Sequence, residues 1–569
     1  MRYHVLAADY DGTLAEHGIV PPSTIDALKR LRDSGRRLVL VTGRRLEPIL
    51  DIFPAVLLFE KIVAENGALV YDPETNEETL LVDPPPEPFV AELRRRGVER
   101  LETGRAIVAT WNPYETVALE VIREMALDLQ IIFNKDAVMI LPSGINKAAG
   151  LSRTLKEIEV SPVNVVAVGD AENDEAMLRL CGASAAVDNA LQPVKEMADI
   201  VLQKPRGEGV EQLVEMILEN DLAHLLGFDG RGLTLGAKRD GRPFSIPQYG
   251  ESLLVTGGPG GGKSKFAISV LEQLTERGEQ CCIIDPEGDY PGIDNAVALG
   301  NSERAPSIEE VVGVLKQPDE HCIVSLYSVE KDERPSYCDR LHRALAELRS
   351  RCGRPHWIIV DEAHYAAPRG WEPANQWNPV ELEGYIFVSA FHDELSDVVL
   401  QNVKWFISIA SDPHQAIVEI CQRIGQQSPR FAAAEGRQIH QALAWRRGDR
   451  RTQWFSRITP RVDGQRHLHS YYNGEMDEDL QFVFRGPESK LKLPAANLKE
   501  FVKTANGVDD ETWQFHLTNH HVSQWLREVV RDAELAMEVE DIERTKSLSA
   551  EQSREQIVYH IERRFKPKW

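Results

Sequence analysis

Two acidic residues near the start of the chain follow a short apolar stretch, and their spacing suggests a chemical site. Residues 5–8 (VLAA) are apolar and lead directly into Asp9 and Asp11. Ligands of parallel α/β sheets bind at the carboxyl ends of the strands, so we expect both carboxylates to lie in a site. A buried carboxylate is costly unless it meets a cation or another partner. The pair therefore predicts metal binding or nucleophilic chemistry.

Three later segments supply polar groups that fit the same site. Two of them follow apolar runs at residues 38–41 and 165–168, and the third is SGINKAAGL. The groups that they contribute are Thr42, Gly43, Lys147, Asp170, Asn173 and Asp174. A carboxylate nucleophile, a hydroxyl, a lysine and a magnesium site are the parts that phosphoryl transfer through an aspartyl-phosphate requires.

The four segments resemble the motifs of a known family in type and in order. DYDGT at residues 9–13, TGR at 42–44, the segment around Lys147 and GDAENDEAML at 169–178 resemble those of the haloacid dehalogenase (HAD) superfamily of phosphatases. VAENGALV at residues 63–70 is similar to a segment of its Cof-type branch and of archaeal phosphoglycolate phosphatases. The resemblance extends over nearly all of the N-terminal part of the chain.

This resemblance implies a fold, a cofactor and a role for each site residue. The fold is a Rossmann-like doubly wound sheet over residues 1–222, with a small α/β cap inserted at about 80–143. Asp9 would be the nucleophile and Asp11 the general acid/base. Phosphate would be bound by Thr42, Gly43, Lys147 and Asn173, and Mg2+ would be bound by Asp9, Asp11, Asp170 and Asp174. The short cap favours a small organic phosphate, of the sugar phosphate or phosphoglycolate class.

The order of helices and strands supports the same fold without the resemblance. The segment TIDALKRLRDSGRRLVLVTGRR combines an amphipathic helical pattern with an apolar strand pattern. A second strand pattern, followed by acidic residues, recurs at NVVAVGDAENDEAML. Strands that alternate with helices predict a doubly wound α/β sheet.

A glycine-rich loop in the middle of the chain predicts an ATP site. Residues 257–264 match the pattern GxxxxGK[ST] and lie between an apolar strand pattern at 253–256 and a helix. The glycines let backbone N–H groups face the phosphates, the lysine adds a positive charge, and the serine hydroxyl suits Mg2+. The residues of the loop that we expect to bind nucleotide are Gly257, Gly260, Gly262, Lys263 and Ser264.

An acidic pair downstream predicts hydrolysis of the nucleotide. In HWIIVDEAHY the apolar run 357–360 ends in Asp361, which we expect beside Mg2+ at the nucleotide, and in Glu362, a candidate base for the attacking water. Most P-loop kinases lack such a glutamate, so the pair favours an ATPase. Together with DPEGDY at residues 285–290 and the hairpin before the glycine loop, it resembles the HerA/FtsK group of ring-forming motor ATPases.

The second resemblance implies a RecA-like domain at residues 253–460, after a linker and hairpin at 223–252. It also implies a homo-oligomer, with a hexameric ring as one form. The strand after the acidic pair departs from that family. Ser389 could act as the polar sensor, but Ala390 and Phe391 stand where glutamine is expected, with His392 as a substitute. Arg423 is a candidate for an arginine finger that acts on a neighbouring subunit.

The rest of the sequence limits the other functions. From about residue 497 onward apolar residues recur at helical spacing, so residues 461–569 are expected to form a mostly helical accessory or oligomerisation module. The net charge of -24 disfavours sequence-independent binding of nucleic acid. The chain has no apolar run long enough to cross a membrane and no signal-peptide pattern, and its seven cysteines show no CxxC pair. A reduced, cytoplasmic protein is expected.

These patterns lead to one prediction and two alternatives. The prediction is a Mg2+-dependent phosphatase for a small organic phosphate, fused to an ATP-binding and ATP-hydrolysing domain that assembles or regulates it. One alternative is a nucleic-acid machine in which the phosphatase trims ends during repair or defence. The other is a nucleotide-controlled assembly switch or scaffold.

Overall fold

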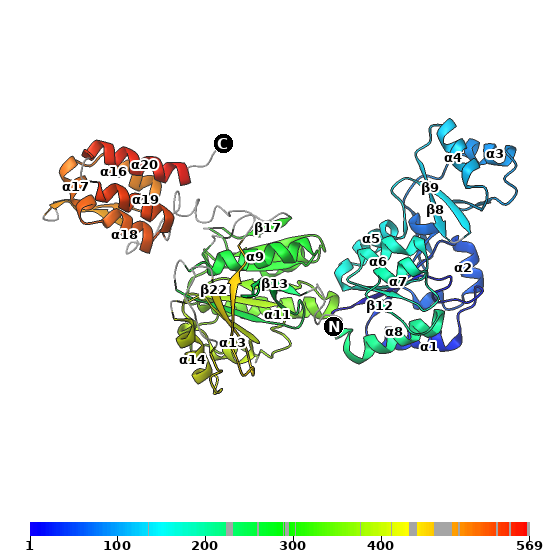
Figure 1. Ribbon diagram of the computed structural model, residues 1–569, viewed down its shortest axis with the longest axis horizontal. Helices are drawn as coiled ribbons and strands as arrows, with labels where there is room; N and C mark the ends of the chain where they lie inside the picture. The colour runs from blue at the N-terminus through cyan, green and yellow to red at the C-terminus, as the bar shows by residue number, and fades with distance from the viewer. Residues whose placement is uncertain are drawn as a thin grey trace.

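The chain folds into three bodies that follow one another in sequence (Figure 1). A first α/β domain with a small cap is followed by a second α/β domain and by a smaller, mainly helical one. The computed structural model describes the whole chain apart from residues 135, 224–231, 259–260, 288–289, 291–294, 302, 376, 411, 432–440, 460–480, 488–489, 531–532, 546–547 and 566–569.

The first domain is built on a sheet of eight strands in the order β12-β11-β10-β1-β2-β3-β4-β5. The strands from β12 to β3 run parallel, and β4 and β5 add an antiparallel edge. Their bounds are β1 (Val5–Ala8), β2 (Arg37–Val41), β3 (Lys61–Ala64), β4 (Leu69–Asp72), β5 (Glu77–Leu80), β10 (Val165–Gly169), β11 (Ala183–Ala186) and β12 (Ile200–Val201). The central strands are fully buried, as their apolar runs predicted.

Helices cover this sheet and carry apolar residues at helical spacing. In α1 the buried residues are Thr24, Ala27, Leu28 and Leu31, and Pro22 at the first position fits the start of a helix. The helices are α1 (Pro22–Asp33), α2 (Leu46–Ile52), α5 (Lys147–Glu157), α6 (Glu175–Leu180), α7 (Gln192–Met197) and α8 (Arg206–Asn220). Short 3-10 turns are η1 (Val56–Leu58), η2 (Glu65–Gly67), η3 (Pro162–Asn164) and η4 (Glu172–Asp174).

The cap is a separate antiparallel sheet with two helices on it. Its strand order is β6-β7-β9-β8. The elements are α3 (Glu87–Arg95), β6 (Glu102–Thr103), β7 (Val108–Trp111), α4 (Glu115–Glu124), β8 (Leu129–Asn134) and β9 (Ala137–Pro142). The cap has its own apolar core, which includes Phe89, Leu93, Val121 and Ile140. It can therefore hold its shape while it lies over the sheet that carries the site residues.

The second domain is built on a sheet of eleven strands in the order β14-β13-β23-β22-β21-β15-β20-β19-β16-β18-β17. The strands from β21 to β17 run parallel, and the others form an antiparallel extension. The strands are β13 (Leu233–Ala237), β14 (Pro243–Ile246), β15 (Leu253–Thr256), β16 (Cys281–Asp285), β17 (Ala296–Leu299), β18 (His321–Ser325), β19 (Trp357–Val360), β20 (Tyr385–Ser389), β21 (Trp405–Ser408), β22 (Gln441–Arg446) and β23 (Gln453–Arg457).

The helices of this domain pack on both sides of its sheet, with two apolar cores that share none of their buried residues. They are α9 (Lys263–Glu276), α10 (Ile308–Leu315), α11 (Arg334–Cys352), α12 (Ala363–Ala366), α13 (Asp397–Asn402) and α14 (Pro413–Arg423), with the 3-10 turn η6 (His392–Glu394). The hairpin β13–β14 belongs to the same sheet and forms one of its edges. The domain is α/β, and its identification as a RecA-like ATPase stays a prediction.

The third body is mainly helical in the residues that the structure describes. Its elements are β24 (Phe482–Phe484), β25 (Leu493–Ala495), α16 (Leu498–Ala505), α17 (Asp510–Thr518), α18 (His521–Glu528), α19 (Ala533–Arg544) and α20 (Ala550–Phe565). The side chains of Asn497 and Asp509 cap α16 and α17. Across the described part of the chain, no helix combines the length and apolar character that a membrane span needs.

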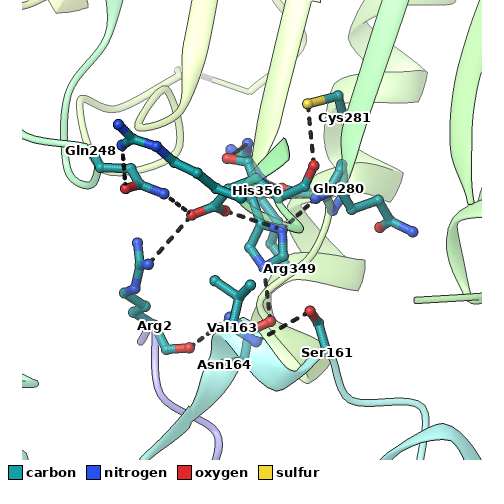
Figure 2. Close-up of polar contacts among 12 residues, drawn as sticks. Arg2, Ser161, Val163, Asn164, Gln248, Gln280, Cys281, Arg349 and His356 are labelled. Atoms are coloured by element: carbon teal, nitrogen blue, oxygen red, sulfur yellow. Dashed lines mark hydrogen bonds and ion pairs between the residues drawn. The ribbon is translucent and has the colours of Figure 1, made fainter. Parts of the chain in front are cut away.

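A buried polar cluster joins the first domain to the second (Figure 2). The Arg2 guanidinium lies 3.3 Å from the Glu279 carboxylate, and the two side chains are only 6% and 1% exposed. Glu279 also accepts a hydrogen bond from the Gln248 amide. Asn164 links both parts, because its Nδ2 donates to the Arg2 carbonyl at 2.7 Å and its Oδ1 lies 2.9 Å from His356 Nε2. We call this set of five residues the joint.

The hydrogen bonds assign the protonation of His356 in the joint. Burial lowers the pKa of His356 to about 4, so the ring is neutral at neutral pH. The backbone N–H of Gln280 donates to Nδ1 at 2.7 Å, which leaves the ring proton on Nε2, facing Asn164. Gly353 permits the close approach, because a Cβ there would lie 2.6 Å from Asn164 Nδ2. The joint is thus tightly fitted as well as polar.

The joint lies at the amino ends of strands from both sheets. Arg2 and Asn164 come shortly before β1 and β10, whereas Glu279 and His356 come shortly before β16 and β19. Within each sheet these strands run parallel. Because residues at carboxyl ends lie at the opposite edge, the polar residues that follow β1, β10, β16 and β19 point away from the joint. The two domains therefore contact each other through the sheet edges at which these strands begin.

The substitution Glu279→Gln should destabilise the protein, because it leaves the Arg2 charge buried without its counter-charge. Removing one partner of a buried pair costs about 3–5 kcal/mol. The free energy of unfolding can be measured by urea denaturation, and Arg2→Met in the Glu279→Gln background should recover part of the loss. The matched control is Glu215→Gln, which removes an exposed pair with Arg30 (54% and 58% exposed) and should change stability by under about 1 kcal/mol. Equal effects of the two glutamine substitutions would contradict a stabilising joint.

Candidate active site

The first domain buries an ammonium group between two carboxylates. Lys147 Nζ donates to Asp9 Oδ1 at 2.5 Å and to Asp174 Oδ1 at 2.6 Å, and none of the three side chains is more than 5% exposed. Burial opposes the charge of Lys147, but the carboxylates of Asp174 and Asp9 outweigh it and raise the pKa of the lysine. Burial also raises the pKa of Asp9 well above its usual range, with Asp174 adding to the effect and Lys147 opposing it.

Asp170 completes a group of three carboxylates with Asp9 and Asp174. One oxygen from each lies within 4.8 Å of the others, and in the described part of the chain this is the one group of three or more His, Cys, Asp or Glu residues that could hold a metal. The group forms because β1 and β10 are neighbouring parallel strands that end at the same edge. A Cβ at Gly12 would lie 2.3 Å from Asp170 Oδ2, so a glycine is needed beside this carboxylate.

The donor set of this group fits Mg2+. Three buried carboxylates carry more negative charge than one ammonium group balances, and carboxylate oxygens are the ligands that Mg2+ prefers. Asp174 has a second task, because its Oδ2 accepts the backbone N–H groups of Asp170 and Ala171 at 2.9 and 3.0 Å. It thereby fixes the turn after β10 as well as the lysine.

Asp11 lies apart from the three carboxylates. Both of its oxygens accept hydrogen bonds from Arg44, Nε to Oδ2 at 2.5 Å and Nη2 to Oδ1 at 2.6 Å. The pair is partly exposed, with 33% of the Arg44 side chain and 37% of the Asp11 side chain accessible. The sequence predicted Asp11 as a metal ligand and as an acid/base. Among the described residues its carboxylate does not join the metal group, and Arg44 was not predicted as its partner.

The predicted phosphate-binding residues gather beside this group. The Thr42 hydroxyl accepts the backbone N–H of Arg44 at 3.1 Å, which shapes the turn after β2. At Gly43 a Cβ would lie 3.2 Å from Met139 Sδ on the cap and 3.4 Å from Asn173 Nδ2, so the turn, the cap and the η4 segment meet there. Asn173 Nδ2 in turn donates to Asn66 Oδ1 at 3.1 Å. Gly43 thus lies between the core residue Asn173 and the cap residue Met139, and Lys147 lies among the carboxylates of the core.

Glu65 holds the cap against the core. Its side chain is fully buried, and its carboxylate accepts three backbone N–H groups of the cap, those of Arg105 and Ala106 at 2.7 Å and that of Ile107 at 3.0 Å. Glu65 also has a positive φ of 52°, a conformation that is strained for glutamate. A Cβ at Gly104 would lie 2.3 Å from the carboxylate, so this cap loop must pass without a side chain. We call this contact the cap latch.

The second domain places its glycine loop and its acidic pair at one edge of the sheet. The loop follows β15 and the pair follows β19, with β20 between them. Lys263 is the first residue of α9, and its Nζ donates to the carbonyl of Gly258 at 3.3 Å. Gly262, with φ 82°, needs the conformational freedom of glycine. Gly260 lies outside the described residues.

The acidic pair of the second domain is held in a strained turn. Glu362 has φ 36° and ψ 54°, a left-handed conformation that glutamate rarely adopts. Its backbone N–H donates to Asp361 Oδ1 at 3.1 Å, and its own carboxylate lies 3.5 Å from His364 Nδ1. Ser264 lies next to Lys263 at the start of α9. Strained residues of this kind concentrate at functional sites.

The residues that were considered as sensors and finger have partners within the same domain. Ser389 ends β20, and its hydroxyl lies 3.2 Å from His364 Nδ1. His392 is 2.8 Å from Glu419 and 3.5 Å from the Thr256 hydroxyl. The guanidinium of Arg423 donates to the carbonyls of residues 392, 393 and 395 and pairs with Asp397. Arg423 therefore stabilises its own loop, which gives no support to a finger that acts on another subunit.

Three residues at the first site were missed by the sequence reasoning. Arg44 and Asn66 stand inside segments that were singled out, but neither was assigned a partner. Glu65 binds a loop some forty residues downstream, a pairing that no local pattern reveals. A signal was present for Glu65 and Asn66, because they precede Gly67 in a short turn between two apolar runs.

Comparisons with known proteins agree on the first domain. The family model of haloacid dehalogenase-like hydrolases matches residues 6–93 and 115–214. A phosphoglycolate phosphatase 2 from Saccharolobus solfataricus is 29% identical over 226 residues, which are 38% of this chain and 93% of that protein. A phosphoglycolate phosphatase from Halorubrum lacusprofundi is 32% identical over 210 residues, 35% of this chain and 89% of that protein.

A solved haloacid dehalogenase-like hydrolase from Bacteroides thetaiotaomicron is 22% identical, with 38% of this chain and 99% of that chain covered and a TM-score of 0.34. The doubly wound sheet, the carboxylate group at its edge and the cap above define a HAD-type hydrolase domain. Through residues 6–214, this chain belongs to the haloacid dehalogenase-like hydrolase family.

The substitution Glu65→Gln should loosen the cap. A glutamine amide group would face backbone N–H donors, so at least one buried hydrogen bond is lost, at a cost of about 1–3 kcal/mol. We expect a lower free energy of unfolding for the first domain and faster proteolysis at residues 102–107. The control is Glu78→Gln, which removes a partly exposed partner of Arg105 and should leave both measurements nearly unchanged. Unchanged proteolysis of Glu65→Gln would argue against the latch.

Proposed function

We propose that the first domain is a Mg2+-dependent phosphatase that acts through an aspartyl-phosphate on a small organic phosphate. The observation that carries this proposal is the buried Lys147, which binds Asp9 and Asp174 next to Asp170. In this proposal Asp9, Asp170 and Asp174 hold Mg2+, which would neutralise charge on the phosphoryl group. Thr42, Gly43, Lys147 and Asn173 bind that group.

The chemistry proceeds in two displacements. First, an oxygen of Asp9 attacks phosphorus, the bond from phosphorus to the leaving oxygen breaks, and that oxygen takes a proton from Asp11. Next, water attacks the phosphorus of the aspartyl-phosphate while Asp11 takes a proton from it, and the bond to Asp9 breaks. The products are the alcohol and inorganic phosphate, and both aspartates return to their starting states. Lys147 orients Asp9 for the first step through their 2.5 Å hydrogen bond.

The contacts between the cap and the core support a small substrate. Glu65 binds the cap to the core through hydrogen bonds, and Met139 of the cap lies next to Gly43 of the core. Both relatives described above are called phosphoglycolate phosphatases. Phosphoglycolate and sugar phosphates are therefore the first compounds to test.

A second activity, ATP binding with hydrolysis, is proposed for the second domain. It is supported by the glycine loop after β15, the acidic pair after β19 and the strained Glu362. Gly257, Gly262, Lys263 and Ser264 would bind the phosphates and Mg2+, Asp361 would lie beside the metal, and Glu362 would activate water. We propose that this domain assembles or regulates the phosphatase in a homo-oligomer within the cytoplasm.

The substitution Asp9→Asn should abolish the phosphatase activity, because an amide cannot attack phosphorus. We expect the rate of p-nitrophenyl phosphate hydrolysis to fall by at least about 1,000-fold. Asp26→Asn, at a carboxylate with a 70% exposed side chain, makes the same change of charge and should retain full activity. Full activity in Asp9→Asn would exclude the aspartyl-phosphate route.

The substitution Lys263→Ala should weaken ATP binding. The loss of charged hydrogen bonds costs about 1.5–3 kcal/mol, which corresponds to roughly ten- to hundredfold weaker binding in titration calorimetry. Lys265→Ala, at the exposed position two residues later, is the control and should bind ATP normally. If wild type binds no ATP, the second activity is refuted, and the phosphatase proposal is not affected.

A further inference from the structure

Arg44 lies in the turn that is expected to bind the phosphoryl group. Its backbone N–H donates to the Thr42 hydroxyl at 3.1 Å, and its carbonyl accepts the backbone N–H of Glu65 at 2.9 Å. The turn is thus tied to the phosphate-binding residues on one side and to the cap latch on the other. The guanidinium packs over the Tyr10 ring at 5.4 Å from its centroid.

The Arg44 guanidinium already binds one carboxylate in a bidentate geometry. Nε and Nη2 donate to the two oxygens of Asp11 at 2.5 and 2.6 Å. Both side chains are about one-third exposed, so a ligand at the mouth of the site can reach the guanidinium.

Asp11 cannot serve the reaction while Arg44 holds both of its oxygens. The carboxylate is directed to the guanidinium and lies outside the group formed by Asp9, Asp170 and Asp174. The pair is bidentate but partly exposed, so an anionic group of a ligand can compete with the Asp11 carboxylate for the guanidinium. A carboxylate or phosphate matches a guanidinium equally well.

We propose that Arg44 binds a second anionic group on the substrate, and that this exchange releases Asp11 toward the leaving oxygen. The inference rests on the phosphatase function proposed above. It assigns the substrate class as phosphate monoesters that carry a carboxylate close to the phosphorus. Arg44 is accordingly a residue that determines specificity and positions Asp11. A substrate without the second anion leaves the Arg44–Asp11 pair intact and is turned over more slowly.

The test compares phosphoglycolate with 2-hydroxyethyl phosphate, in which a hydroxymethyl group replaces the carboxylate. We expect wild type to prefer phosphoglycolate by at least tenfold in kcat/KM, and Arg44→Gln to reduce this preference to about twofold or less. Arg45→Gln is the matched control, because the neighbouring arginine pairs with Glu102 of the cap, and it should keep the preference. Equal use of the two compounds by wild type, or an unchanged preference in Arg44→Gln, would overturn the proposal.

Binding of non-hydrolysable analogues separates this proposal from the phosphatase function itself. With Mg2+ present, 3-phosphonopropionate should bind at least tenfold more weakly to Arg44→Gln than to wild type in titration calorimetry. It should bind more tightly to Asp11→Asn, which lacks the competing carboxylate. Inorganic phosphate should bind the three proteins alike. A similar loss of phosphate binding in Arg44→Gln would assign Arg44 to the phosphoryl group instead and would overturn the proposal.

The outcomes separate a failure of the proposed role of Arg44 from a failure of the proposed phosphatase function. If wild type hydrolyses p-nitrophenyl phosphate but does not discriminate between the two esters, the phosphatase function stands and the role of Arg44 is wrong. If wild type hydrolyses none of the three compounds, the proposed phosphatase function fails, and analogue binding alone decides whether Arg44 recognises a carboxylate.

Discussion

The buried joint between Arg2, Asn164, Gln248, Glu279 and His356 is the constraint on which the arrangement of the two α/β domains depends. An ion pair that is almost fully removed from water depends on its counter-charge and on the hydrogen bonds that surround it. Here the partners come from both domains, and the neutral His356 completes the cluster by donating to Asn164. The Arg2–Glu279 pair and the Asn164–His356 hydrogen bond each need a side chain from both domains, so neither forms in one domain alone.

Because the two domains meet at the amino ends of these strands, both candidate sites lie at the opposite, carboxyl ends. Strands β1 and β10 start at the joint and end at Asp9 and Asp170, and β16 and β19 start there and end at Asp285 and Asp361. Because every one of these strands is parallel to its neighbours in its own sheet, no site residue can turn back toward the joint. The two candidate sites therefore lie at the sheet edges that are farthest from the joint.

The first candidate site, like the interface between the two domains, is built around buried charged side chains. Lys147 donates hydrogen bonds to the buried side chains of Asp9 and Asp174, and Asp174 also binds the turn that presents Asp170. The sequence predicted Asp9, Asp170 and Asp174 because they follow apolar runs whose strand ends must converge in a parallel sheet, and it predicted Lys147 as the cation within SGINKAAGL. β1 at residues 5–8, β15 at 253–256 and β19 at 357–360 have the predicted bounds. The partners of Arg44, Glu65 and Asn164 could not be predicted, because they are distant in sequence and are set by tertiary packing.

The separation of the sites limits how they could act together. The candidate site at the carboxyl end of β1 faces away from the second domain, so the strand directions provide no direct path for a ligand between the two candidate sites. Any influence of nucleotide on the phosphatase must pass through the strands and the joint, or through contacts between subunits. The first route requires that β16 and β19 have two arrangements with different contacts to Glu279 and His356. The fit at Gly353 and Asn164 leaves little space for such a shift, so the proposed action of the second domain on the first is more readily explained by the proposed assembly into an oligomer.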